Sequence, residues 1–150
     1  MKYRSLTGEE LAGLEKEFIN FLIVNGIDAQ EWEKIKIHES GQGERMIDIF
    51  SDMIFEGICL KVKYLEHFDK QGLKLFRCDD HLIRLTGIIT DTAFDSVHEM
   101  MVHIAKSPAK FRIFHTSKGY LPDRNMEIFR MISAGAVITD GTYYEHFQNQ

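Results

Sequence analysis

The spacing of apolar residues changes near residue 70, and this change limits the folds open to the chain. Before it, apolar side chains recur every three or four residues, as on one face of a helix; after it, short strand-like runs appear. Helices followed by strands are typical of an α+β fold. We therefore expect residues 1–70 to be helical and residues 71–150 to mix strand and helix, with the N-terminal helices packed on a small mixed β-sheet.

Capping signals place the first two helices. Thr7 followed by Glu10 forms a capping box, and Asp28 before the next apolar stripe repeats the signal. The first helix is expected to continue to Asn25-Gly26, because glycine suits the left-handed position after a helix end.

A glycine-rich segment, Ser40-Gly41-Gln42-Gly43, predicts a break in the chain. The dense apolar positions from Glu44 to about Phe68 then predict one long helix. A strand over residues 58–64 is the alternative, because the side chains there partly alternate.

The second half of the chain predicts the order β-β-α-β-α-β. The helix after the first two strands is expected to be capped by Asp91 or Thr92, and the next helix by Asp123. The strand–helix–strand step over residues 82–116 allows one parallel pair with a right-handed crossover. The expected strands are 73–78, 82–89, 111–116 and 136–139, and the first of the two helices is 92–106.

Charge and length exclude some classes of protein. The 150 residues fit a single α+β domain, and the net charge of −5 argues against general nucleic-acid binding. Residues 106–130 nevertheless hold six basic and two acidic side chains, which leaves binding of a small anion possible.

The two cysteines, Cys59 and Cys78, have apolar neighbours and suit a reducing compartment better than a disulfide. We expect no signal peptide, because the first ten residues lack an apolar core, and no membrane-spanning segment. These features predict a cytoplasmic protein.

Common catalytic motifs for nucleotide, zinc and serine-hydrolase chemistry are absent, so no cofactor and no catalytic residue is predicted. The best local candidate is the loop 117–125, expected between a strand and a helix N-terminus, where an anion would be favoured. Its candidate ligand-binding residues are Ser117, Lys118, Tyr120, Arg124 and Asn125. The alternative is a solvated turn that leads into a helix.

A weaker candidate lies on the predicted helix 92–106. Asp95, Glu99 and His103 are spaced four apart and share one face, where they could contribute to a metal site. Because the set is incomplete, we expect no bound metal and interpret the stripe as the exposed face of an amphipathic helix.

The chain ends in an aromatic cluster that includes Tyr143, Tyr144 and Phe147. If these rings are exposed, they form a surface for a partner or for self-association. The alternative is that they fold back onto the sheet.

Four segments carry a family resemblance: the opening Met-Lys-Tyr-Arg-x-Leu-Thr-x-Glu-Glu-Leu, residues 61–67, residues 124–130 and residues 138–141. In these segments the chain resembles an uncharacterised family of small bacterial proteins of unknown function. The resemblance covers nearly the whole chain, implies one intact bacterial domain, and adds no catalytic residue.

These observations favour a non-enzymatic binding or interaction module, with an unknown protein partner or a second copy of itself. The alternative is a small-molecule binder, or an enzyme, that acts on a phosphate-bearing ligand at residues 117–125.

Overall fold

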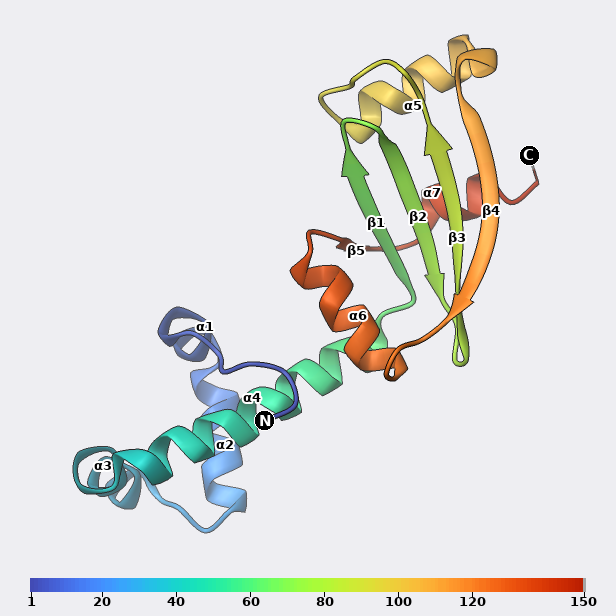
Figure 1. The fold of residues 1–150 in the computed structure, drawn as a ribbon. Coiled ribbons are helices and arrows are strands. Elements are labelled where there is room, and N and C mark those ends of the chain that lie inside the picture. The colour runs from blue at the N-terminus through green and yellow to red at the C-terminus, as the bar shows by residue number, and fades with distance from the viewer. Residues whose placement is uncertain (150) are drawn as a thin grey trace. The chain divides into compact units, whose positions relative to one another are not determined.

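The computed structural model describes residues 1–149. Its elements, in chain order, are α1 (Gly8–Gly13), α2 (Glu15–Val24), α3 (Ala29–His38), α4 (Ser40–Lys61), β1 (Tyr64–Asp69), β2 (Gly72–Cys78), β3 (Leu82–Ile89), α5 (Val97–Lys106), η1 (Pro108–Lys110), β4 (Arg112–Gly119), α6 (Arg124–Ser133), β5 (Val137–Thr139) and α7 (Thr142–His146) (Figure 1). Helices come first and strands follow, which confirms the α+β prediction.

The chain divides into two compact units, residues 1–58 and residues 59–150, which we call the helical unit and the sheet unit. Helix α4 begins in the first and ends in the second. The division is geometric, so the expectation that residues 1–150 fold as one domain stays a prediction.

The two predicted helix starts in the helical unit are confirmed. The Thr7 hydroxyl accepts a hydrogen bond from the Glu10 amide, and the Glu10 carboxylate accepts one from the Thr7 amide. Hydrogen bonds from Arg4 and from that amide lower the pKa of Glu10 to about 2. The Asp28 carboxylate caps α3 by accepting a hydrogen bond from the Glu31 amide. The single first helix is wrong, because the backbone leaves helical geometry at Leu14 and separates α1 from α2.

Helix α4 differs from its predicted boundaries at both ends. Residues 40–43 form its first turn rather than a break, and Gly43 is buried beside Trp32 and Ile35. Tertiary packing here overrides the low helix propensity of glycine. The helix ends at Lys61, so the predicted continuation to Phe68 is wrong; the strand that follows, β1, also starts later than the alternative strand at 58–64.

Aromatic rings fill the core of the helical unit. The Phe18 ring lies 5.0 Å from that of Phe50 and 5.1 Å from that of Trp32, measured between centroids. Phe18 and Phe50 are buried, while Phe21 and Ile54 are half-buried.

The sheet has the strand order β4-β3-β2-β1-β5, and every neighbouring pair is antiparallel. The predicted mixed sheet is therefore wrong. Ile89 at the end of β3 pairs with Arg112 at the start of β4, so α5 and η1 return the chain to the same end of the sheet instead of crossing it. β1 adds a strand before the predicted ones, and residues 142–146 add helix α7.

Of the two helix caps predicted after β3, the first is wrong and the second is confirmed. Helix α5 is capped by Ser96, whose hydroxyl accepts from the Glu99 amide, and not by Asp91 or Thr92. Helix α6 is capped by Asp123 as predicted.

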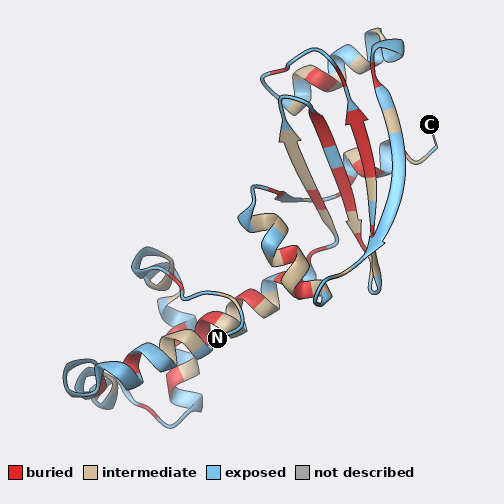
Figure 2. Cartoon of the chain, in the orientation of Figure 1, coloured by how far each residue is buried: buried red, intermediate tan, exposed pale blue. Residues whose placement is uncertain are grey.

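Both faces of the sheet are apolar, and each packs against different helices (Figures 1 and 2). On the α6 face, a cluster that includes Leu65, Phe76 and both cysteines meets Ile128 of α6. On the opposite face, Leu73, Leu75 and Ile88 meet α5 and α7. Leu75 is buried at the centre of β2, whereas Leu85, Ile113 and Phe129 are half-buried. Cys59 and Cys78 are free thiols.

Within residues 1–149, no helix is both long enough and apolar enough to cross a membrane.

Candidate interaction surface

Arg124 belongs to the predicted anion site, but all the N–H groups of its guanidinium donate hydrogen bonds within the chain. Its five N–H groups donate to the backbone carbonyls of Cys59, Val62, Cys78 and Asp79 and to the Asn125 side chain. A guanidinium has only five donors, so none is left for a ligand. Arg124 instead connects the end of α4 to the end of β2, because it donates to backbone carbonyls at both.

Two other residues of the predicted loop are also drawn inward. The Tyr120 hydroxyl donates to the Asp79 carbonyl at 2.7 Å, and burial raises the pKa of this phenol far above its ordinary value. Asn125 is buried. The structure therefore separates these side chains from Ser117 and Lys118, which lie on β4 and face solvent.

A hollow of about 420 Å³ beside Arg124 is lined by charged side chains, including Arg77 and Asp79. Burial alone would raise the pKa of Asp79, but hydrogen bonds from Arg77 and Arg84 outweigh it and hold the pKa below its ordinary value. Arg77 is already paired with Asp79, and Arg124 donates to backbone carbonyls, so these two cations of the hollow offer little to an incoming anion.

The candidate metal residues do not converge. The Glu99 carboxylate accepts from the Asp95 amide at 3.0 Å, and the His103 ring packs against Phe94 with 4.9 Å between centroids. No group of three or more histidine, cysteine, aspartate or glutamate side chains among residues 1–149 is placed to hold a metal ion.

The C-terminal aromatic side chains fold back onto the sheet, which was the alternative prediction. Tyr144 and Phe147 are 3% and 1% exposed and belong to the core cluster under α5, while Tyr143 is half-buried. Gly141, with φ of 83°, makes the turn that starts α7, and an added Cβ there would lie 2.5 Å from the Tyr64 ring. Tyr144 and Phe147 therefore cannot form an exposed partner surface.

The most accessible part of the sheet is strand β4, which lies at its edge. Seven of its eight residues are exposed, and the eighth, Ile113, is half-buried. Figure 2 shows the strand as exposed along almost its entire length. At the other edge, β5 has only three residues.

The pairing pattern identifies the backbone groups of β4 that lack a strand partner. The Asp79 amide donates to the Leu82 carbonyl, and the Cys78 amide to the Lys63 carbonyl, which fixes the alternation of hydrogen-bonded pairs through β2 and β3. Continued across β3, this alternation directs every second residue of β4 toward the open edge. These residues are Ile113, His115, Ser117 and Gly119.

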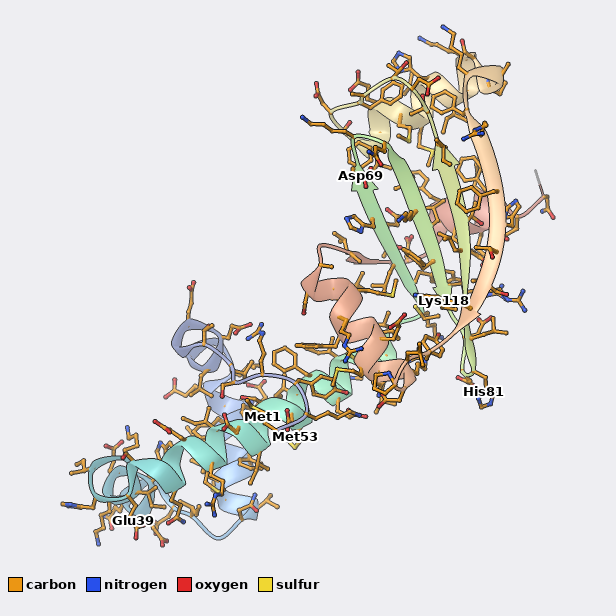
Figure 3. The ribbon with its side chains drawn as sticks, viewed as in Figure 1. Met1, Glu39, Met53, Asp69, His81 and Lys118 are labelled. Carbon is orange, nitrogen blue, oxygen red and sulfur yellow. The ribbon has the colours of Figure 1, made fainter. Side chains whose placement is uncertain are left out.

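The side chains of β4 make this edge basic. The strand contains Arg112 and Lys118 and no acidic residue. Lys118, labelled in Figure 3, donates to Glu127 of α6 at 2.6 Å, and its side chain is still 60% exposed. No ion pair of Arg112 is found among the described residues.

A phenylalanine adds an apolar element beside these cations. Phe114 lies opposite Gly87, and its ring occupies the space in which a Cβ of Gly87 would stand, with ring carbons only 2.2 Å from that position. The ring is 40% exposed and borders a small apolar hollow of about 190 Å³ on the open half of the α6 face.

His115 is held by a polar network. Its Nδ1 lies 2.9 Å from the Thr86 hydroxyl, which also accepts from the Gln148 amide at 3.0 Å. Thr86 is completely buried, so its oxygen cannot meet a substrate, and the network serves to fix the His115 ring beside the edge.

Sequence reasoning reached Ser117 and Lys118 but missed Arg112, Phe114 and His115. The available signal was the acid-free run from residue 112 to residue 119, in a chain that is acidic as a whole.

Comparison with known proteins gives a family and no chemistry. The model of a family of unknown function, DUF6495, matches residues 1–150. The chain belongs to this family. No curated protein and no solved structure shows a significant match. Its function therefore has to be inferred from the surface of the chain itself.

Proposed function

We propose that the chain is a non-enzymatic protein-interaction module that accepts an extended, acidic segment of a partner protein as an additional strand beside β4. The observation that carries the proposal is the combination of an eight-residue exposed edge strand with a complete lack of acidic side chains. Unpaired edges bind extended peptides through main-chain hydrogen bonds, and the flanking side chains give specificity.

Charge favours a partner over a second copy of this chain. In an antiparallel β4–β4 pair, the basic ends of one strand would lie near those of the other, with Arg112 facing the Lys118 end. Like charges placed across a strand pair are destabilising. An acidic segment would instead place carboxylates beside Arg112 and beside the Lys118 side chain, which is 60% exposed although it pairs with Glu127.

The test uses a fluorescein-labelled probe peptide of about eight residues with alternating glutamate and valine, a length that matches a typical strand. Fluorescence anisotropy should detect its binding to the full chain. A peptide with lysine in place of glutamate should not bind. Binding should weaken with added salt, because exposed charge pairs are screened over about 8 Å at physiological ionic strength.

One matched pair of variants tests the main-chain contact. Ser117→Pro removes an outward N–H and spares the inward ladder, and proline is tolerated in edge strands at such positions. We expect affinity to fall about tenfold, as for a lost hydrogen bond with an unpaired partner. Ser117→Ala keeps the N–H and should bind like the native chain. Equal binding by the two variants would contradict strand addition.

Hydrogen exchange of the native chain gives a second measurement that does not depend on the proline variant folding. The amides of Ile113, His115 and Ser117 should exchange rapidly in the free chain and slowly with the acidic peptide bound. The double variant Arg112→Glu, Lys118→Glu should lose this protection. A concentration-dependent dimer with protected β4 amides would instead indicate self-association.

A further inference from the structure

A second surface, in the helical unit, has the opposite character. Helices α2 and α3 enclose a groove of about 390 Å³. Its apolar lining consists of Phe18, Ile19, Leu22, Ile23, Ile27, Ala29 and Trp32. Of these, Phe18, Leu22 and Ile27 are buried and form the floor, whereas Ile19 and Ile23 are 46% and 60% exposed.

The sequence builds the two walls from one stripe of each helix. On α2, Glu15, Ile19 and Ile23 are spaced four apart; the Asp28 cap is followed on α3 by Trp32 and Lys36 at the same spacing. Residues four apart lie above one another on a helix. From residue 15 to residue 23 the stripe is about 12 Å long at 1.5 Å per residue, which matches about two turns of a bound helix.

The rim of the groove is acidic. Its lining carries the carboxylates of Glu15, Asp28 and Glu33 against one ammonium group, that of Lys36, which pairs with Glu33 at 2.9 Å. The whole helical unit holds 12 acidic and 6 basic side chains, a net charge of −6. Such a field attracts a basic segment and repels a second copy of the same unit.

We propose that this groove binds a basic amphipathic helix of a partner protein, with apolar side chains against Ile19, Ile23 and Trp32 and lysine or arginine side chains toward the acidic rim. Helix-in-groove recognition uses apolar anchors at this three- and four-residue spacing. The proposal is independent of strand addition at β4, because none of its residues belongs to the sheet unit.

The chain contains its own reporter for the test. Trp32 is the single tryptophan and lies in the groove, where its ring packs edge-on against Phe18. A synthetic peptide of about 14 leucine and lysine residues, patterned as an amphipathic helix and free of tryptophan and tyrosine, is long enough to form a marginal helix in water. On addition to the full chain it should shift the Trp32 emission to shorter wavelength. The same peptide with glutamate for lysine should leave the emission unchanged.

Two isoleucines of α2 and α3 provide matched variants. Ile23→Asp changes the groove, and Ile37→Asp makes the same change at a 72% exposed position outside its lining. Both add a negative charge, so simple electrostatic attraction would strengthen binding in both. We expect Ile23→Asp to weaken binding about tenfold, as for loss of an apolar anchor, and Ile37→Asp to bind at least as tightly as the native chain.

Three results would overturn the proposal. They are equal binding by the two aspartate variants, equal binding of the glutamate and lysine peptides, and a concentration-dependent dimer that Ile23→Asp abolishes. The Ser117→Pro variant should bind the lysine peptide normally. A loss there together with a loss of acidic-peptide binding would instead indicate that the substitution unfolds the chain.

Discussion

The helical unit and the sheet unit leave different kinds of surface free. A helix satisfies its backbone hydrogen bonds internally, so the α2–α3 groove presents only side chains. An edge strand leaves N–H and C=O groups open, so β4 presents its main chain as well. The charges differ too: the helical unit carries −6, while the sheet unit holds 11 acidic and 12 basic side chains for a net charge of +1. The overall charge of −5 therefore conceals two regions suited to opposite partners.

The largest effect is expected in the core of the helical unit. Phe50 is completely buried and contacts the rings of Phe18 and Phe21. Replacing it with alanine should lower the free energy of unfolding by about 3–5 kcal/mol, as for other buried phenylalanines. Urea unfolding followed by Trp32 fluorescence measures the change. The exposed Ile37→Ala should stay within about 0.5 kcal/mol of the native chain; a similar small change for Phe50→Ala would contradict the packing described for this unit.

In the sheet unit, the largest loss of stability is expected on removing the hydrogen bonds of Arg124. Arg124→Ala removes a donor from each of four backbone carbonyls, of which those of Cys59 and Asp79 keep a second donor. We expect a loss of about 3 kcal/mol in the free energy of unfolding, because desolvated polar groups are costly to leave unpaired. Urea unfolding followed by circular dichroism provides the measurement. Arg130→Ala is the control, since this exposed side chain makes one long hydrogen bond of 3.4 Å to the Leu121 carbonyl. Equal stabilities of the two variants would return Arg124 to the list of candidate ligand-binding residues.

A smaller effect is expected at the contact between Gly87 and Phe114. An alanine at residue 87 would push the Phe114 ring away, at about 1–2 kcal/mol, because overpacking strains its neighbours. In the double variant Gly87→Ala, Phe114→Ala, the absence of the ring should remove most of this penalty. A double-mutant cycle from urea unfolding tests the coupling; additive effects would show that the ring moves aside freely.

The smallest effect concerns the exposed capping box of the helical unit. The pKa of Glu10 is about 2 in the folded chain, below the value of about 4.3 for an unperturbed glutamate. Its contribution to stability is therefore present above that unfolded value and is lost as the pH falls through the folded pKa. Glu10→Gln should reduce the loss of stability between pH 5 and about pH 2, in thermal unfolding at low salt. An unchanged pH dependence would show that Arg4 and Thr7 do not hold this carboxylate in solution.

Local signals predicted the elements that depend on local interactions. Thr7, Asp28 and Asp123 cap helices as expected, because each hydrogen bond closes within three residues. The hairpin of β2 and β3 was also predicted, since its turn and alternating side chains are adjacent in sequence.

The errors arose where distant residues decide. Residues 40–43 look like a break, but the packing of Gly43 near Trp32 keeps them helical. Residues 64–69 look like the end of a helix until β2 and β5 pair with them from both sides. The same limit applied to function: the sequence showed Arg124 as a free cation because the four carbonyls that occupy it come from residues 59 to 79.

The two buried cysteines allow the opening of the sheet unit to be followed by the rate of thiol alkylation. Cys59 and Cys78 are 1% and 5% exposed, and burial raises the pKa of the Cys78 thiol to about 11. Alkylating reagents attack the thiolate, so packing protects both sulfurs and the raised pKa further protects that of Cys78. Modification at neutral pH then requires the α6 face of the sheet to open. The rate of alkylation therefore reports how often this face opens. Because both thiols lie in the sheet unit and the indole of Trp32 lies in the helical unit, the native sequence can report on the opening of each unit separately, without an added label site.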